Sequence, residues 1–207
     1  MPDLRERVSN GNGVLATMRV KRQDPYSLVV GMTGVKLGDQ VMQFGCASGG
    51  PLAAVAAKVG LSGRAVAAIS DDQTEARLQK AAAKAGVLVE VERVAADGRD
   101  RLPFEDGQFD LALVDDTDGS FAARAAEERI AIVRELWRIV RPGGRAMMIG
   151  RGERQGLAAL LSRAPNGPSY VASGDANAAL EADGFRGVRT LAEREGLVFV
   201  EGIKPRP

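Results

Sequence analysis

The chain of 207 residues contains no histidine and only one cysteine, Cys46. The absence of histidine excludes a Ser-His-Asp triad, a Cys-His pair and a zinc site of the HExxH type. A single cysteine cannot form an intrachain disulfide, and without a cluster of Cys and His residues structural zinc has no ligands. Any catalysis must therefore use carboxylates, tyrosine, lysine, backbone dipoles or a cofactor.

An excess of charge of one sign is also absent, as are long apolar runs. The 28 Lys and Arg residues nearly balance the 27 Asp and Glu residues, which gives a net charge of +1 and no strong nucleic-acid signal. The longest uncharged stretch, residues 40–57, is interrupted by three glycines and a proline, so it predicts no membrane span. We expect a soluble, cytoplasmic protein.

A length of 207 residues allows one domain, and its 25 glycines fall in short clusters between strand-like and helix-like segments. Ser70-Asp-Asp-Gln73 matches the capping-box pattern that begins a helix, and residues 193–196 predict a hairpin turn. This alternation predicts an α/β, doubly wound, Rossmann-like sheet that is mostly parallel, with an antiparallel last strand and helices on both faces. The predicted strands are residues 39–45, 64–69, 87–94, 109–114, 145–149, 186–192 and 197–203, and the predicted helices are residues 24–30, 51–58, 70–84, 121–140, 153–163 and 174–183.

Ligands of an open α/β sheet bind beyond the carboxyl ends of its strands, near the point where the strand order reverses. The connection after the first predicted strand, residues 45–50, reads G-C-A-S-G-G and leads straight into a helix. Glycines there let the backbone approach a ligand, and the helix start presents free N–H groups. A tight turn that binds nothing would have the same composition, so this signal alone is weak.

Three further segments agree with this loop in order and spacing. Residues 38–49 read G-D-Q-V-M-Q-F-G-C-A-S-G, residues 96–97 read A-D, residues 102–110 read L-P-F-E-D-G-Q-F-D, and residues 135–145 read E-L-W-R-I-V-R-P-G-G-R. Together they resemble the motifs of class I S-adenosylmethionine-dependent methyltransferases of the type 11, UbiE-like kind. The resemblance covers about residues 36–203.

The resemblance implies a seven-stranded sheet with S-adenosyl-L-methionine lying across the tips of the first, second and fourth strands. It implies that the glycine loop passes close to the methionine portion of this cofactor. Asp97 and the backbone N–H of Gly98 would contact the adenine amino edge, although Asp97 in a capped turn is the alternative. The implied cofactor positions are Gln43, Gly45, Cys46, Ala47, Gly49, Ala68, Ile69, Asp97, Gly98 and Asp115.

Three of these positions depart from the family pattern. Gln43 replaces the acid at the end of the first strand, and Ala47 replaces the middle glycine of the loop. Ala68 stands where a carboxylate normally holds both ribose hydroxyls, and a shifted register would place Ile69 or Ser70 there instead. Losing that carboxylate should weaken cofactor binding by roughly ten- to a hundredfold. Asp71 or Asp72 could compensate only by reaching back.

The methyl acceptor would lie beyond the fourth strand, where residues 115–118 read D-D-T-D. Asp115 is our candidate catalytic residue, as a general base or as a group that orients the acceptor. The alternative is that Asp116, Asp118 or Ser120 caps the following helix. We predict no metal, because residues 150–152 after the fifth strand offer no carboxylate.

We divide the chain into residues 1–35, a basic and helical extension that would cover the pocket, and residues 36–207, the methyltransferase-like domain. Tyr26 in the extension either closes the pocket or packs half-buried against the domain. Cys46 is read as a small buried residue, because no base is available to activate it.

Two functions remain open at this point. One is a methyltransferase acting on a small-molecule acceptor. The other is a catalytically inactive protein of the same fold, a structural or regulatory subunit with a protein complex partner, as the changes at Gln43, Ala47 and Ala68 would allow. A nicotinamide-dependent oxidoreductase fits less well, because no acid for the ribose lies about 20 residues after the loop.

Overall fold

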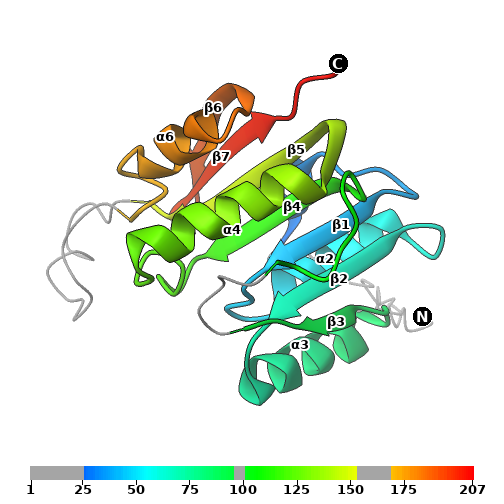
Figure 1. The fold of residues 1–207 in the computed structure, drawn as a ribbon. Helices are drawn as coiled ribbons and strands as arrows, with labels where there is room; N and C mark the ends of the chain where they lie inside the picture. Colours follow the sequence, from blue (N-terminus) through cyan, green and yellow to red (C-terminus); the bar gives the residue numbers. More distant parts are fainter. Residues whose placement is uncertain (1–25, 96–100, 153–168) are drawn as a thin grey trace, which may run out of the picture.

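A computed structural model describes residues 26–95, 101–152 and 169–207 of the chain. Seven strands form one sheet in the order β3-β2-β1-β4-β5-β7-β6, and only β7 runs against the others (Figure 1). The strands are β1 (Gln40–Phe44), β2 (Arg64–Ile69), β3 (Glu90–Arg93), β4 (Phe109–Asp116), β5 (Val140–Arg151), β6 (Arg186–Arg194) and β7 (Leu197–Ile203). The helices are α1 (Ser27–Thr33), α2 (Gly50–Val59), α3 (Asp72–Ala85), α4 (Ala126–Ile139) and α6 (Asp175–Ala182). The predicted fold class is confirmed.

The helices cover both faces of the sheet because side chains alternate along each strand. Even-numbered residues of β1, β2 and β4 pack with α4 and α6, whereas odd-numbered residues of the same strands pack with α1, α2 and α3, except for Phe109 before the register shift in β4, which packs with α4. Val66 and Ala68 of β2 therefore face α4, and Ala65 and Ala67 face α3. Both faces of the central strands are buried, which explains their nearly continuous apolar sequences.

The strand order reverses between β1 and β4. Met42 of β1 pairs with Val66 of β2 on one side and with Ala112 of β4 on the other. Because β1, β2 and β4 are parallel, their carboxyl ends meet at one edge, which we call the carboxyl edge of the sheet. The opposite edge is called the amino edge.

Two helix starts differ from the sequence-based expectation. Asp71, not Ser70, is the N-cap of α3, because its extended backbone lets a carboxylate oxygen accept from the Thr74 N–H at 2.8 Å. The helix expected from residue 121 begins at Ala126 instead. The N–H groups of Phe121 and Ala122 are turned toward the Asp116 carboxylate, so this segment is not helical.

The starts of two strands also differ from the predicted ones. β5 begins at Val140, directly after α4, so the predicted Pro142-Gly-Gly turn lies within this strand. The pairing with β4 is irregular there, because the register shifts between Phe109 and Leu111. β3 begins at Glu90 rather than at residue 87.

The hairpin between β6 and β7 is confirmed. Its two turn residues, Glu195 and Gly196, both have positive φ values, 55° and 73°. This backbone matches the type I′ turn that joins twisted antiparallel strands.

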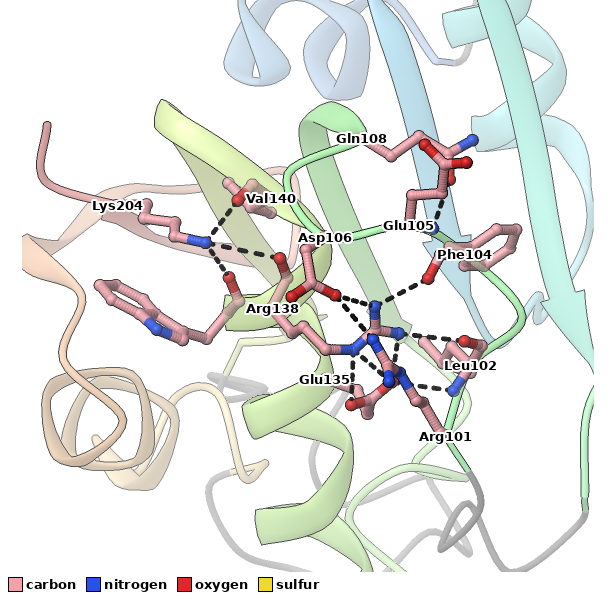
Figure 2. A network of polar contacts seen from close by, with 11 residues as sticks. Arg101, Leu102, Phe104, Glu105, Asp106, Gln108, Glu135, Arg138, Val140 and Lys204 are labelled. Carbon is pink, nitrogen blue, oxygen red and sulfur yellow. Dashed lines mark hydrogen bonds and ion pairs between the residues drawn. The ribbon is translucent and has the colours of Figure 1, made fainter.

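A network of polar contacts holds the β3–β4 connection against α4 (Figure 2). The Arg138 guanidinium donates to the Phe104 carbonyl at 2.7 Å and to the Leu102 carbonyl at 3.0 Å, and it pairs with Glu135 and Asp106. Glu135 in turn accepts from the Leu102 N–H at 2.8 Å. The pKa of Arg138 is raised, first by its hydrogen bonds to Glu135.

Lys204, which follows β7, completes this network at the end of α4 (Figure 2). Its Nζ donates to the carbonyls of Trp137 and Val140 at 2.7 and 2.8 Å and lies 5.0 Å from the centre of the Trp137 ring. We call Arg138, Glu135, Asp106 and Lys204 the amino-edge clamp, because it fastens the chain where β4 and β5 begin.

Parts of two predictions lie outside the described residues. They are residues 1–25 of the expected pocket-covering extension and the helix expected at 153–163. The described part of the extension, α1, places Val29 in the same apolar cluster as Val55 of α2 and Val41 of β1.

Candidate active site at the carboxyl edge

A cavity of about 310 Å³ opens at the carboxyl edge, where β1, β2 and β4 end. Four of the predicted cofactor positions, Gly45, Cys46, Ala68 and Ile69, line it. Its other walls come from the first turns of α3, from Val94 after β3, and from the connection between β4 and α4. The structure therefore brings together the loops at which the sequence places the ligand.

Of the remaining predicted positions, Gln43, Ala47, Gly49 and Asp115 are described by the structure but do not line the cavity. Gln43 is 1% exposed, and its Nε2 donates to the Gly45 carbonyl at 2.9 Å, so its amide fixes the start of the glycine loop. Asp97 and Gly98 lie outside the described residues.

Two glycines of the loop have positive φ, and each has a distinct neighbour. Gly45 (φ +71°) lies where an added Cβ would be 3.5 Å from the backbone oxygen of Asp115. Gly49 (φ +74°) lies where a Cβ would be 2.7 Å from the Leu78 Cα. Close packing on α3 therefore requires glycine at 49, whether or not a ligand is bound.

Each of the two acids that could replace the missing ribose carboxylate already has a partner in the structure. Asp71 lines the cavity, but it accepts from the Thr74 N–H, and this hydrogen bond holds the pKa of Asp71 below its usual range. Asp72 pairs with Arg93 at 2.5 Å. The space beside Ala68 thus has no carboxylate dedicated to a ribose.

Asp115 is the most unusual group at this edge. Asp115 is only 2% exposed, and its Oδ1 accepts from the N–H and the hydroxyl of Thr117 at 3.1 and 2.6 Å. Among the residues that the structure describes, its Oδ2 has no hydrogen-bond partner. Burial raises the pKa of Asp115, although the Thr117 hydrogen bonds and the Ala47 N–H oppose the rise.

Asp116 repeats this arrangement on the opposite face of β4. Oδ1 accepts from the backbone N–H groups of Phe121 and Ala122 at 2.8 and 3.0 Å, and Oδ2 has no partner among the described residues. Burial raises the pKa of this carboxyl as well. The expected alternative, a cap on the following helix, is wrong, because the N-cap of α4 is Ala125 and receives no side-chain hydrogen bond.

Cys46 and Tyr26 have packing roles. Burial, with Asp115 nearby, raises the pKa of the Cys46 thiol to about 12, which keeps it protonated and unreactive. The Tyr26 ring lies against Gly50 so closely that a Cβ on Gly50 would meet it at 2.1 Å. Tyr26 therefore packs on the start of α2, and no part of it lines the cavity.

The sequence analysis missed two arginines that line the cavity. Arg77 projects from α3, where its Nη2 donates to the Thr74 hydroxyl at 2.8 Å. Arg124 comes from the segment assigned in error to the long helix, and its guanidinium carbon lies 5.2 Å from the centre of the Phe44 ring. Helical spacing from Thr74 could have identified Arg77, whereas nothing in the sequence marked Arg124.

A wider depression of about 710 Å³ is lined by residues between Arg101 and Gln108, beside the amino-edge clamp. It is open to solvent and distant from the glycine loop. We therefore assign the site to the smaller cavity.

A family model described as a methyltransferase domain matches residues 41–144. This match covers half of the chain and includes every wall of the cavity. The chain belongs to the class I S-adenosylmethionine-dependent methyltransferases. S-adenosylmethionine is accordingly the cofactor that membership implies.

Two curated methyltransferases resemble this member of the family over part of their length. The chloroplastic 2-phytyl-1,4-beta-naphthoquinone methyltransferase of Arabidopsis thaliana is 26% identical over 125 residues, which are 59% of this chain and 46% of that protein. The ubiquinone/menaquinone biosynthesis C-methyltransferase UbiE of Enterobacter sp. is 29% identical over 117 residues, 56% of this chain and 44% of that protein. The chain matches less than half the length of either relative.

Solved structures agree with the methyltransferase fold. A SAM-dependent methyltransferase from Aquifex aeolicus superposes with a TM-score of 0.68 at 19% identity, covering 86% of this chain and 89% of that one. The [4+2]-cyclase SpnF superposes with a TM-score of 0.64 at 17% identity, covering 88% and 80%. These similarities concern the fold alone, and the second neighbour is named for a cyclisation rather than a methyl transfer.

The residues present fit the methyltransferase cofactor at its cationic end. A buried carboxylate with one unpaired oxygen, Asp115, lies against the loop at Gly45 without itself lining the cavity, and such a group favours a nearby cation. The ribose end differs, because Ala68 supplies no acid. Within the described ranges, no group of three or more Cys, Asp or Glu residues could hold a metal ion. No helix in the same ranges has both the length and the apolar character needed to cross a membrane.

Proposed function

We propose that this chain transfers a methyl group from S-adenosylmethionine to a small-molecule acceptor. The observation that supports the proposal most strongly is the unpaired Oδ2 of Asp115, buried beside the glycine loop. An unpaired buried oxygen is costly, so it is retained where a ligand completes its hydrogen bonding.

Each residue of the site has a separate task in this proposal. Gly45 and the amides of the following loop would hold the methionine portion, and Phe44 and Ile69 would bound the adenosine. When bound, the cofactor supplies an electrophilic methyl group on a sulfonium. Asp115 would accept the proton that the acceptor atom loses as its bond to the methyl carbon forms and the bond from that carbon to the sulfonium sulfur breaks, leaving a thioether, and its raised pKa suits that task.

The absence of histidine does not prevent such a reaction. Holding two reactants in line inside a site from which water is excluded can supply about 7–11 kcal/mol of the barrier. A positioned base typically adds a factor of about 10² to 10⁴. The acceptor is a small organic molecule in our proposal, and the quinone rings named in the two curated relatives are the first compounds to test.

A second function has its own support. Ala68 leaves the ribose without a carboxylate, and neither Asp71 nor Asp72 replaces it. A protein that has lost the cofactor would keep the fold and could act as a subunit of a complex. Calorimetry with millimolar S-adenosylmethionine separates the two functions, because the inactive protein would give neither heat nor a thermal shift.

The variant Asp115→Asn tests the proposal itself. Replacing the carboxylate with a neutral amide should weaken binding of S-adenosylhomocysteine or S-adenosylmethionine by about tenfold or more, with the larger loss for the charged sulfonium. Asp72→Asn is the matched control, since its carboxylate is exposed and paired with Arg93. Equal affinities for the wild type and Asp115→Asn would contradict the role given to Asp115.

A further inference from the structure

The three most exposed of the large apolar side chains that the structure describes lie on neighbouring loops at the amino edge. Leu37 precedes β1 and is 73% exposed, Leu61 precedes β2 and is 98% exposed, and Leu88 precedes β3 and is 84% exposed. The next two, Ile130 and Ile203, are only 50% and 41% exposed. A single exposed leucine is ordinary, but three on adjacent loops indicate an interaction surface.

The pairing of the strands brings these loops together. β1, β2 and β3 are neighbouring parallel strands, so the segments that lead into them reach the same edge of the sheet (Figure 1). A Cβ on Gly60 would lie 2.7 Å from the Leu37 Cδ1, and Leu61 is the next residue. Leu88 lies two residues before the start of β3, the strand beside β2. We call Leu37, Leu61 and Leu88 the leucine patch.

Exposed lysines accompany the leucine patch. Lys58 lies in the last turn of α2 and Lys84 in the last turn of α3, and both helices end at the amino edge because each leads into the next parallel strand. Lys36 is the residue before Leu37. All three lysines are exposed, and none has an ion pair within the described part of the chain.

The acids of these connections already have partners. Residues 34–39, 58–64 and 84–90 contain four basic side chains and only two acids. Asp39 accepts from the Lys36 N–H at 2.8 Å, and Glu90 pairs with Arg64 at 2.6 Å. The leucine patch therefore lies in an excess of positive charge, which attracts an anionic partner over a distance of about 8 Å at physiological ionic strength.

Exposed leucine beside unpaired lysine favours lipid over protein as that partner. Lysine is depleted in protein–protein interfaces, and leucine is under-represented among the residues that dominate their binding energy. Surfaces that lie on membranes instead combine apolar side chains such as leucine with lysine and arginine, which anionic headgroups attract. Because each leucine is at least 73% exposed, it can enter a lipid surface without rearrangement of the fold.

We propose that the leucine patch and its three lysines, Lys36, Lys58 and Lys84, dock this chain on the surface of an anionic lipid membrane. The leucines would enter the boundary between headgroups and acyl chains, and the lysines would contact the negatively charged groups of the lipids. The amino edge would then face the membrane, and the carboxyl-edge cavity would face the aqueous side. The inference uses no residue of the cavity, so it goes beyond methyl transfer and is independent of it.

Cosedimentation of the full chain with vesicles tests this inference. One set of vesicles contains phosphatidylcholine with phosphatidylserine, and the other contains phosphatidylcholine alone. We expect the anionic vesicles to bind about a hundredfold more tightly, because each of three lysines near such a surface contributes roughly a factor of five. Salt at about 1 M, where the Debye length is about 3 Å, should remove most of that preference. No binding to the anionic vesicles, or equal binding to both sets, would overturn the inference.

The triple variant Leu37→Ser, Leu61→Ser and Leu88→Ser tests the leucines. Its affinity for anionic vesicles should fall about tenfold or more, because three apolar side chains no longer enter the lipid. Ile130→Ser, which replaces an exposed isoleucine on α4, is the control and should bind like the wild type. Thermal unfolding verifies that each variant is folded. A folded triple variant with the affinity of the wild type would contradict the role of the leucine patch.

The triple variant Lys36→Gln, Lys58→Gln and Lys84→Gln tests the charge. It should lose most of the preference for anionic vesicles, since glutamine keeps a polar side chain but carries no charge. Arg194→Gln is the control, because this exposed arginine ends β6 at the carboxyl edge. A preference that survives in the lysine variant, or that Arg194→Gln removes equally well, would contradict the assignment to the three lysines.

The competing occupant of the leucine patch is a second copy of the chain. Sedimentation velocity without lipid would reveal it as a dimer that the leucine variant dissociates. Such a dimer, with no binding to anionic vesicles, would overturn the membrane inference.

Calorimetry with S-adenosylhomocysteine keeps this inference apart from the proposed function, because none of the substituted residues lines the cavity. Vesicle binding without binding of S-adenosylhomocysteine would refute cofactor binding and support docking. The reverse result would refute docking alone.

Discussion

The two edges of the sheet treat buried polar groups in opposite ways. At the amino edge, Arg138 and Glu135 are mostly buried and hydrogen-bonded to each other and to two backbone carbonyls and an N–H. At the carboxyl edge, Asp115 and Asp116 are more deeply buried, yet each keeps one oxygen without a partner in the described residues. The first arrangement is typical of structural support and the second of a binding site.

The difference follows from the topology. The connection from β3 to β4 has no described helix, and at its Arg101–Gln108 end polar contacts with α4 add to the apolar packing of Leu102 and Phe104. At the carboxyl edge the strands end in loops that leave an opening between them. A sheet of this kind can therefore be strengthened at one edge and left incompletely paired at the other.

Arg138→Ala should give the largest effect on stability. It leaves Glu135 and the carbonyls of Leu102 and Phe104 without their donor, so we expect the free energy of unfolding to fall by about 3–5 kcal/mol. Arg141→Ala is the control, because the Arg141 side chain, which pairs with Asp110, is about half exposed, and its loss should cost less than about 1 kcal/mol. Urea unfolding measures both variants. Similar losses of unfolding free energy would contradict the stabilising role that we give to the amino-edge clamp.

Asp115 and Asp116 at the carboxyl edge should lower stability at neutral pH, whereas Arg138 at the amino edge raises it. Their pKa values are raised in the folded chain, so the folded state holds its protons more tightly than the unfolded chain does. Stability should therefore fall as the pH rises through the ordinary carboxyl pKa toward the raised values. We expect Asp115→Asn with Asp116→Asn to abolish that decline and to gain about 1–3 kcal/mol at neutral pH.

Asp71 provides the control for this sign. Its pKa is lowered by the Thr74 hydrogen bond, so its contribution is present above the ordinary pKa and is lost as the pH falls. Unfolding curves between about pH 2 and pH 7, a range that extends well below the ordinary aspartate pKa of about 3.9, separate the two cases. A double variant with the same pH dependence as the wild type would mean that the unpaired oxygens are satisfied in solution.

Lys204→Met should weaken the clamp by a smaller amount. The variant keeps the apolar stem but loses the hydrogen bonds to the Trp137 and Val140 carbonyls at the end of α4. We expect a loss of about 1–2 kcal/mol in urea unfolding. Lys36→Met, an exposed lysine on a loop, should change stability by less than about 0.5 kcal/mol, and an equal effect would remove Lys204 from the clamp.

The smallest expected effect on stability comes from a strained backbone position, Glu195, which lies at the carboxyl edge but outside the cavity wall. Glu195 has a φ of 55° in the β6–β7 turn, a conformation that asparagine adopts more readily. Glu195→Asn should raise the free energy of unfolding by about 0.5–1 kcal/mol. Its affinity for S-adenosylhomocysteine should stay that of the wild type, and a change there would show that this turn communicates with the site.

The strands and the mostly parallel sheet with its antiparallel last strand were accessible from the sequence, because alternation, glycine punctuation and the final hairpin turn are local signals. The bounds of α4 were not, because the Asp116 carboxylate binds two N–H groups five and six residues along the chain and turns the segment away from a helix. The same error concealed Arg124. The motif singled out position 68, and the structure places Ala68 in the cavity wall.

The chemistry of the site was only partly predictable. The run of acids after the fourth predicted strand pointed to Asp115, but its unpaired oxygen depends on burial beside β1 and its loop, which no local pattern encodes. The partners of Asp71 and Asp72 could not be predicted from the sequence either. Asp71 accepts from a backbone N–H of α3, and Asp72 pairs with Arg93 of β3. Function at this edge is decided by which polar groups remain unpaired after folding.

A crystal structure of the chain with S-adenosylhomocysteine tests the central claim most directly. The account predicts the amino acid end of the ligand beside Gly45 and the Asp115 Oδ2, with the ribose over Ala68 and no side-chain carboxylate on its hydroxyls. A ligand bound elsewhere, or a carboxylate of Asp71 or Asp118 closing on the ribose, would contradict it.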